Sequence, residues 1–204
     1  MHCYINFSNT SFLSPSLPRH VMRIISTNEI NKSKLVQEIL AGAVFIYPTD
    51  TIYGIGCVAT NSAAVKRIRE LKQRDTKPFS VIVPSIDWIR ENCEISEHAK
   101  SWLQKLPGPY TLIFPLKNPA AVSHETNMGM KTLGIRIPDH WISSLVESIG
   151  KPIVTTSVNI VGKPPCTTKT EFEQFNVDFI IYEGDKAGKP STIVDTVTGK
   201  VVQR

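Results

Sequence analysis

Short apolar runs alternate with amphipathic segments along most of the sequence, and this alternation constrains the fold more than any other feature. The apolar runs have the length of strands, whereas the amphipathic segments repeat their apolar residues at helical spacing. Strands are predicted at 23–26, 43–48, 78–84, 110–117, 132–139, 152–159, 177–184, 191–195 and 200–204. Helices are predicted at 31–43, 62–74, 86–92, 96–106, 140–150 and 170–175, and a loop is predicted at 118–131. The irregular order of strands and helices predicts an α/β domain with a mixed sheet.

The size and charge of the chain set broad limits on its function. Its 204 residues are enough for one domain with a sizeable core, and its net charge of +5 suits a polyanionic ligand. No window approaches about 18 consecutive apolar residues, so no membrane span is expected. The four cysteines show neither a disulfide framework nor a metal spacing, which favours a cytoplasmic protein. Residues 1–21 are polar and are predicted to be a flexible extension or a start placed too early, with the domain opening at Met22.

Hydroxyl and amide side chains gather beside the predicted strands. They form three clusters, at Thr49–Thr51, Ser157–Asn159 and Ser191–Thr192. The serine and the asparagine of the second cluster can both donate and accept hydrogen bonds, so they suit a zwitterion or a nucleotide. Each cluster could also simply form or cap a turn. Because ligands of open α/β sheets tend to bind beyond the carboxyl ends of strands, we expect the clusters to meet there.

The helix predicted at 62–74 carries much of the positive charge. Its apolar face predicts that three of its cations point largely to solvent, namely Lys66, Arg67 and Arg69. Lys72 and Arg74 lie at the helix end and enter the loop before the next strand. Two cations there could grip a triphosphate, or they could offset the helix dipole and stay solvated.

Arg136 lies inside an apolar strand, between Ile135 and Ile137. An arginine in such a place usually needs an anion, which could be a structural carboxylate or the carboxylate or phosphate of a ligand. The sequence leaves both alternatives open. It contains no P-loop, no dinucleotide-binding loop and no G-x-S-x-G motif, so a bound nucleotide would be held by dispersed cations and hydroxyls.

Six stretches occur in an order that resembles one known family. They are YPTDTIYGIGC, LKQRDTKPFSVIV, LPGPYTLIF, TLGIRIPD, TTSVNIVGKP and PSTIVD. Together they resemble the YrdC (TsaC) family of threonylcarbamoyl-AMP synthases over residues 23–204. The resemblance implies a twisted, open mixed sheet flanked by helices, with a basic concave face.

The same resemblance implies a nucleotidyltransferase. Its substrates would be L-threonine, bicarbonate and ATP, and its products threonylcarbamoyl-AMP and pyrophosphate. Mg²⁺ would enter with the ATP phosphates and would have no protein ligand. A partner complex, the tRNA threonylcarbamoyl-transferase, would then modify adenosine 37 of ANN-decoding tRNAs, and the basic face could contact tRNA.

The family's site residues carry over by position. The threonine site would consist of Thr49, Arg136 and Ser191. Lys72 and Arg74 match the catalytic K-x-R pair at the ATP phosphates. The remaining nucleotide contacts would be Thr132, Ser157, Asn159 and Arg204. One departure is that Asp75 directly follows Arg74, where many relatives have proline in a loop one residue longer.

The alternative is a non-enzymatic module of the same fold that binds tRNA or double-stranded RNA. A basic face could hold the phosphates of a duplex without any catalysis. That function needs only the cations, and it gives no reason for hydroxyls and an amide to accompany them.

Overall fold

One open mixed sheet of ten strands organises the protein. The computed structural model describes residues 22–203, so the predicted extension 1–21 and Arg204 lie outside the described residues. The strand order is β1-β8-β2-β3-β7-β4-β6-β5-β9-β10. The strands are β1 (Arg23–Ser26), β2 (Phe45–Tyr47), β3 (Gly54–Gly56), β4 (Ser80–Ile82), β5 (Tyr110–Pro115), β6 (Thr132–Arg136), β7 (Ile153–Ser157), β8 (Phe179–Tyr182), β9 (Thr192–Asp195) and β10 (Val201–Val202).

The helices confirm most of the predicted segments. The α-helices are α1 (Lys32–Leu40), α2 (Ser62–Lys72), α3 (Ile86–Asn92), α4 (Glu97–Leu103), α5 (His124–Asn127), α6 (Ile142–Ile149) and α7 (Lys169–Phe172). Asn61 caps α2 by accepting a hydrogen bond from the amide of Ala64, and Gly150 ends α6 with φ of 68°. The predicted loop at 118–131 contains the 3₁₀ turn η2 (Pro119–Ala121) and α5, both too short to show a period. A second 3₁₀ turn, η1, spans Thr27–Glu29.

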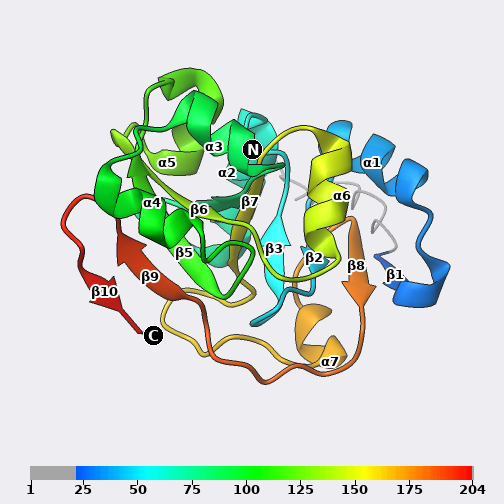
Figure 1. Ribbon diagram of the computed structural model, residues 1–204. Coiled ribbons are helices and arrows are strands. Elements are labelled where there is room, and N and C mark those ends of the chain that lie inside the picture. Colours follow the sequence, from blue (N-terminus) through cyan, green and yellow to red (C-terminus); the bar gives the residue numbers. More distant parts are fainter. Residues whose placement is uncertain (1–21, 204) are drawn as a thin grey trace, which may run out of the picture.

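Helices cover both faces of the sheet. Helices α1 and α6 lie side by side and pack on one face, as Figure 1 shows, and α2, α3, α4 and α7 contribute to the core on the other. Strand β2 contributes to the cores on both faces of the sheet. Phe45 and Tyr47 belong to the core under α1 and α6, whereas Ile46 belongs to the core on the opposite face. Among residues 22–203, no helix is long and apolar enough to cross a membrane.

The glycines that follow the first hydroxyl cluster form a strand that the sequence did not reveal. Strand β3 pairs antiparallel with β2 and with β7. A Cβ atom on Gly56 would lie 2.2 Å from the carbonyl oxygen of Val154 and 2.9 Å from the ring of Tyr47, so only glycine fits there. Glycine therefore lets the three strands approach closely just behind the hydroxyl cluster.

The strand directions decide where a ligand could bind. Strand β3 is antiparallel to both β2 and β7, so β2 and β7 run in the same direction, and Thr49–Thr51 and Ser157–Asn159 lie at their carboxyl ends, at one end of the sheet. Ser191 and Thr192 instead lie at the start of β9, so the prediction that the clusters lie at carboxyl ends is confirmed for two clusters and wrong for the third. All three clusters meet over one face of the sheet.

Candidate active site

A cavity of about 110 Å³ lies over this face of the sheet and brings most of the predicted site residues together. Its floor comes from β4, β5 and β7, through Ser80, Thr111 and Thr155. Its walls contain five residues predicted from the sequence, which are Thr49, Arg74, Arg136, Ser157 and Ser191. Because the lining residues run from residue 49 to residue 191, the site forms only when segments far apart in the sequence come together in the sheet.

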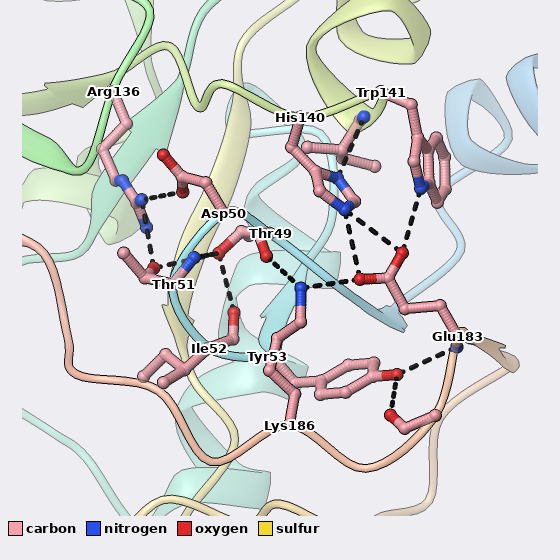
Figure 2. Close-up of polar contacts among 12 residues, drawn as sticks. Thr49, Asp50, Thr51, Ile52, Tyr53, Arg136, His140, Trp141, Glu183 and Lys186 are labelled. Carbon is pink, nitrogen blue, oxygen red and sulfur yellow. Dashed lines mark hydrogen bonds and ion pairs between the residues drawn. The ribbon is translucent and has the colours of Figure 1, made fainter.

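The loop after β2 presents Thr49 in a fixed position. The Thr49 hydroxyl donates to the carbonyl oxygen of Ile52 at 2.7 Å and accepts from the amide of Thr51 at 3.1 Å (Figure 2). It also lies 3.0 Å from the hydroxyl of Thr51. The side chain is almost fully buried in the cavity wall, so the turn that the sequence suggested holds this hydroxyl in one orientation.

Arg136 is neutralised by a carboxylate of the protein itself. Its Nη2 donates to Oδ1 of Asp50 at 2.7 Å, and the two side chains are only 7% and 10% exposed. The same nitrogen donates to the hydroxyl of Thr51 at 3.2 Å. The other oxygen of Asp50 accepts from the amide of Asp139 at 3.2 Å. Of the two anions left open by the sequence, the structural carboxylate is present, and Asp50 braces the Thr49 loop against β6.

Ser191 completes this end of the cavity. Its hydroxyl lies 2.7 Å from that of Thr111 on β5, and both residues are buried. The preceding Pro190 also lines the wall. This end of the cavity therefore offers several hydroxyls around an arginine whose charge is balanced.

Lys72 is buried at the opposite end, not solvated. Its ammonium donates to the carbonyl oxygens of Ser157 and Asn159, the latter at 2.8 Å, and to Oδ1 of Asn159 at 3.1 Å. These contacts use all three of its N–H bonds. Burial, and to a lesser extent the charge of Arg74, lowers the pKa of Lys72 from 10.5 to about 7. Lys72 itself is not a wall residue, because it lies just behind the Ser157–Asn159 turn.

The Ser157–Asn159 turn is tied together by its own side chains. The hydroxyl of Ser157 donates to Oδ1 of Asn159 at 2.6 Å. The amide nitrogen of Asn159 donates to the carbonyl oxygens of Ile160 and Lys163, at 3.1 and 2.8 Å. Ser157 faces the cavity, and Asn159 supports it from behind.

Arg69 is the residue at this end that the sequence analysis misplaced. It was expected to point to solvent, but it is 8% exposed. Its Nη1 donates to the carbonyl oxygens of Arg74, Asp75 and Lys77, at 2.9, 3.4 and 3.2 Å. Its guanidinium lies 4.4 Å from the ring centroid of Phe79, and that of Arg74 lies 5.0 Å from the same centroid. The loop after α2 folds back over the helix end and buries Arg69, which helical periodicity alone does not predict.

Arg74 reaches the cavity from this folded loop. Its guanidinium donates to the carbonyl oxygens of Lys77 and Pro78, at 3.3 and 2.6 Å, and to the hydroxyl of Thr156 at 3.4 Å. Among residues 22–203, no carboxylate forms an ion pair with Lys72 or Arg69. The charges of Lys72 and Arg69 are therefore met by backbone carbonyl oxygens.

Two predicted residues do not join this group. Thr132 lies at the opposite end of β6 from Arg136, roughly 13 Å along the strand, and does not line the cavity. Arg204 lies outside the described residues.

Cys57 is fully buried, and burial raises the pKa of its thiol well above the ordinary value.

Comparisons with known proteins decide the family. The sequence model of the Sua5/YciO/YrdC family, described as "Telomere recombination", matches residues 37–204. A Vibrio campbellii protein named threonylcarbamoyl-AMP synthase is 31% identical over 184 residues, which are 85% of this chain and 98% of that protein. The chain belongs to the Sua5/YciO/YrdC family. The resemblance noted from the sequence is confirmed.

Two further relatives of this family show how its members match the chain. A Klebsiella pneumoniae protein, also named threonylcarbamoyl-AMP synthase, is 34% identical over 170 residues, covering 79% of this chain and 88% of that protein. The structure of P. abyssi Sua5 complexed with L-threonine superposes with a TM-score of 0.77 at 28% identity. That match covers 90% of this chain and 56% of the P. abyssi chain, so the present chain spans little more than half of it.

Proposed function

We propose that this protein is an L-threonylcarbamoyl-AMP synthase, a nucleotidyltransferase that forms threonylcarbamoyl-AMP and pyrophosphate from L-threonine, bicarbonate and ATP. The observation that carries the proposal is one cavity with two unlike ends. One end has hydroxyls and an arginine paired with Asp50, and the other has the guanidinium of Arg74 and the hydroxyl of Ser157, with the buried ammonium of Lys72 behind them. The names of the relatives point to the same activity.

The hydroxyl-rich end suits an amino acid. A zwitterion carries no net charge, so it matches a site in which Asp50 already balances Arg136. Arg136 would orient the carboxylate of L-threonine, while Thr49 and Ser191 would hold the rest of the molecule. The similarity to P. abyssi Sua5, whose structure was determined in complex with L-threonine, supports the presence of a threonine site.

The opposite end suits the ATP phosphates. Arg74 reaches the cavity and would contact a phosphate directly, and Ser157 would meet the adenylate. Lys72 would act mainly as a nearby charge and as the support of the Ser157 turn, since all its N–H bonds are already used. Asn159 would act with it, and Thr132 and Arg204 remain proposed nucleotide contacts.

Mg²⁺ would enter with ATP. Among residues 22–203, no group of three or more His, Cys, Asp or Glu side chains is arranged to hold a metal ion. In this proposal, the phosphates of ATP would hold the ion. When bound there, it would neutralise charge on the departing pyrophosphate.

The chemistry needs no protein nucleophile. The neutral amine of threonine attacks CO₂ derived from bicarbonate and forms N-carboxy-threonine, and the proton of the amine is released to water. The new carboxylate then attacks the α-phosphorus, and the bond to pyrophosphate breaks. The protein contributes by holding the two substrates in line and by stabilising the charge that develops on the phosphates.

The direct test is pyrophosphate release, with the product identified by mass spectrometry. We expect release to require ATP, L-threonine and bicarbonate together, and to fall when L-serine replaces L-threonine. Pyrophosphate release that does not depend on L-threonine would contradict the proposal. Tight binding of duplex RNA by a protein that releases no pyrophosphate would favour the RNA-binding alternative.

The product would pass to a tRNA threonylcarbamoyl-transferase complex. Threonylcarbamoyl-AMP is an activated mixed anhydride, so a second enzyme must transfer the group to adenosine 37 of ANN-decoding tRNAs. A cytoplasmic location and a contact between the basic surface and tRNA belong to the same proposal.

A further inference from the structure

The segment 183–190 crosses from one half of the sheet to the other and touches the Thr49 loop on the way. It joins β8, which lies near one edge of the sheet, to β9, which lies near the other. A Cβ atom on Gly188 would lie 2.0 Å from the carbonyl oxygen of Thr51, so the two backbones are in direct contact. The segment ends at Pro190 and Ser191 in the cavity wall.

Tyr53 anchors the start of this segment. Its hydroxyl donates to the carbonyl oxygen of Gly184 at 2.8 Å and accepts from the amide of Glu183 at 3.0 Å. Burial raises the pKa of Tyr53 to about 12, so the hydroxyl stays protonated and can serve both bonds. The first residues of the segment are thereby fixed relative to the loop that contains Thr49.

Glu183 is the centre of the polar contacts in Figure 2. Its carboxylate forms an ion pair with Lys186 at 2.6 Å and accepts from Nε1 of Trp141 at 3.2 Å. Nε2 of His140 also lies 3.2 Å from it. Burial alone would raise the pKa of Glu183, but the bonds from Lys186 and Trp141 outweigh it and lower the pKa below the ordinary value. Glu183 therefore carries a full negative charge to hold Lys186.

Lys186 connects Glu183 to the loop that contains Thr49. Its ammonium donates to the carbonyl oxygen of Thr49 at 2.6 Å. The Lys186 side chain is 25% exposed and that of Glu183 is 20% exposed, so neither belongs to the deep core. The Thr49–Asp50 peptide is thus held from two sides, by Lys186 at the carbonyl and by Arg136 at the Asp50 carboxylate.

We propose that Glu183 and Lys186 are positioning residues that hold the Thr49 loop in the geometry needed to bind the amino-acid substrate. Neither lines the cavity, so both would act through Thr49. This inference rests on the proposed function, because it assumes that Thr49 meets L-threonine. A small displacement of a positioned group can weaken binding and turnover strongly, so removing the ammonium is expected to matter beyond its own contacts.

The test compares four full-length single variants and the double variant of Lys186→Met with Glu183→Gln. Lys186→Met removes the ammonium but keeps an apolar stem, and Glu183→Gln removes the charge that holds it. Lys186→Arg can still reach both partners. Lys151→Met is the matched control, because Lys151 is exposed and precedes β7 at the end away from Ser157.

We expect Lys186→Met and Glu183→Gln each to raise the Kd and KM for L-threonine roughly tenfold. The KM for ATP and the unfolding midpoint in urea should stay close to those of Lys151→Met. The double variant should be little worse than either single variant, because both act through one contact. Lys186→Arg should recover most of the threonine affinity.

The variants could overturn the inference in two ways. One is an unchanged threonine Kd in a folded Lys186→Met variant. The other is loss of folding, or equal weakening of both substrates, since either would make the contacts merely structural. Calorimetric titration of L-threonine separates this inference from the proposed function. Wild-type protein that binds threonine but releases no pyrophosphate would defeat the function alone, and wild-type protein that binds no threonine would defeat the inference.

Discussion

The two ends of the cavity neutralise their cations in different ways. At the threonine end, Arg136 pairs with Asp50 and Lys186 pairs with Glu183. At the phosphate end, Lys72 and Arg69 donate to backbone carbonyl oxygens. Loss of Arg136 would leave the buried carboxylate of Asp50 behind, whereas loss of Lys72 would leave only dipoles. The comparison predicts that Arg136 matters most for stability and that the cations of the phosphate end matter most for catalysis.

The largest effect should come from Arg136→Ala. It leaves Asp50 buried without its partner, so the free energy of unfolding should fall by about 3–5 kcal/mol. Urea unfolding measures this change. Arg90→Ala is the control, because Arg90 and Asp87 form an exposed pair, 64% and 75% accessible, and such pairs contribute about 0–1 kcal/mol. Equal losses in the two variants would show that burial of the Asp50 pair carries no special weight.

Lys72→Met should affect the reaction far more than the fold. The variant keeps the apolar stem but removes the charge near the phosphates, so pyrophosphate release should fall roughly 100- to 1,000-fold. The unfolding midpoint should fall modestly relative to that of Lys66→Met, an exposed lysine of the same helix, because three acceptors of the Ser157–Asn159 turn lose their donor. A Lys72→Met variant with wild-type turnover would show that Lys72 has no role in the reaction.

Arg69→Met tests whether the folded loop presents Arg74. Without its shared donor, the loop carrying Arg74 should loosen, and the KM for ATP should rise roughly tenfold while the KM for threonine stays unchanged. Arg67→Met is the matched control, because Arg67 pairs with Asp178 and does not line the cavity. If the KM values for threonine and ATP rose equally, the two ends of the cavity would not be independent.

The smallest effect should be a pH dependence specific to ATP. The folded pKa of Lys72 lies at about 7, below its ordinary 10.5, so Lys72 loses its proton as pH rises through 7. Since the charged form favours phosphate, the KM for ATP should rise roughly threefold between pH 6.5 and 7.5. Lys72→Arg stays charged and should remove this component from the profile. An identical profile in Lys72→Arg would assign the titration to another group.

Local patterns in the sequence predicted most elements because they depend on near neighbours. The helices predicted at 62–74 and 140–150 are confirmed, because Asn61 begins the first and Gly150 ends the second through local backbone hydrogen bonds and geometry. The K-x-R and S-x-N stretches do come together, through the bonds of Lys72 to the Ser157–Asn159 turn. Strand β3 was missed because glycines carry no β propensity, although packing against Tyr47 requires them.

Contacts between distant residues could not be predicted in this way. Periodicity placed Arg69 on the solvent face of α2, because it cannot anticipate a loop that folds back over the helix. The sequence predicted that Arg136 contacts an anion. It could not show whether that anion is a ligand or a carboxylate of the protein such as Asp50, which is 86 residues away. Lys186 and Thr49 are 137 residues apart, so their bond depends on strand order.

The position of β8 has a consequence for a chain that is still being made. Strand β8 lies between β1 and β2, although it follows β2 by more than a hundred residues. At about 5–20 residues per second, the ribosome would need on the order of ten seconds to supply it. Until then, β1 and one side of β2 would lack the partner that the finished sheet gives them. Nascent chains on one messenger RNA would expose the same unpaired strand edges at the same time and could pair with one another. The spacing of the ribosomes would therefore affect how much protein folds to the native form.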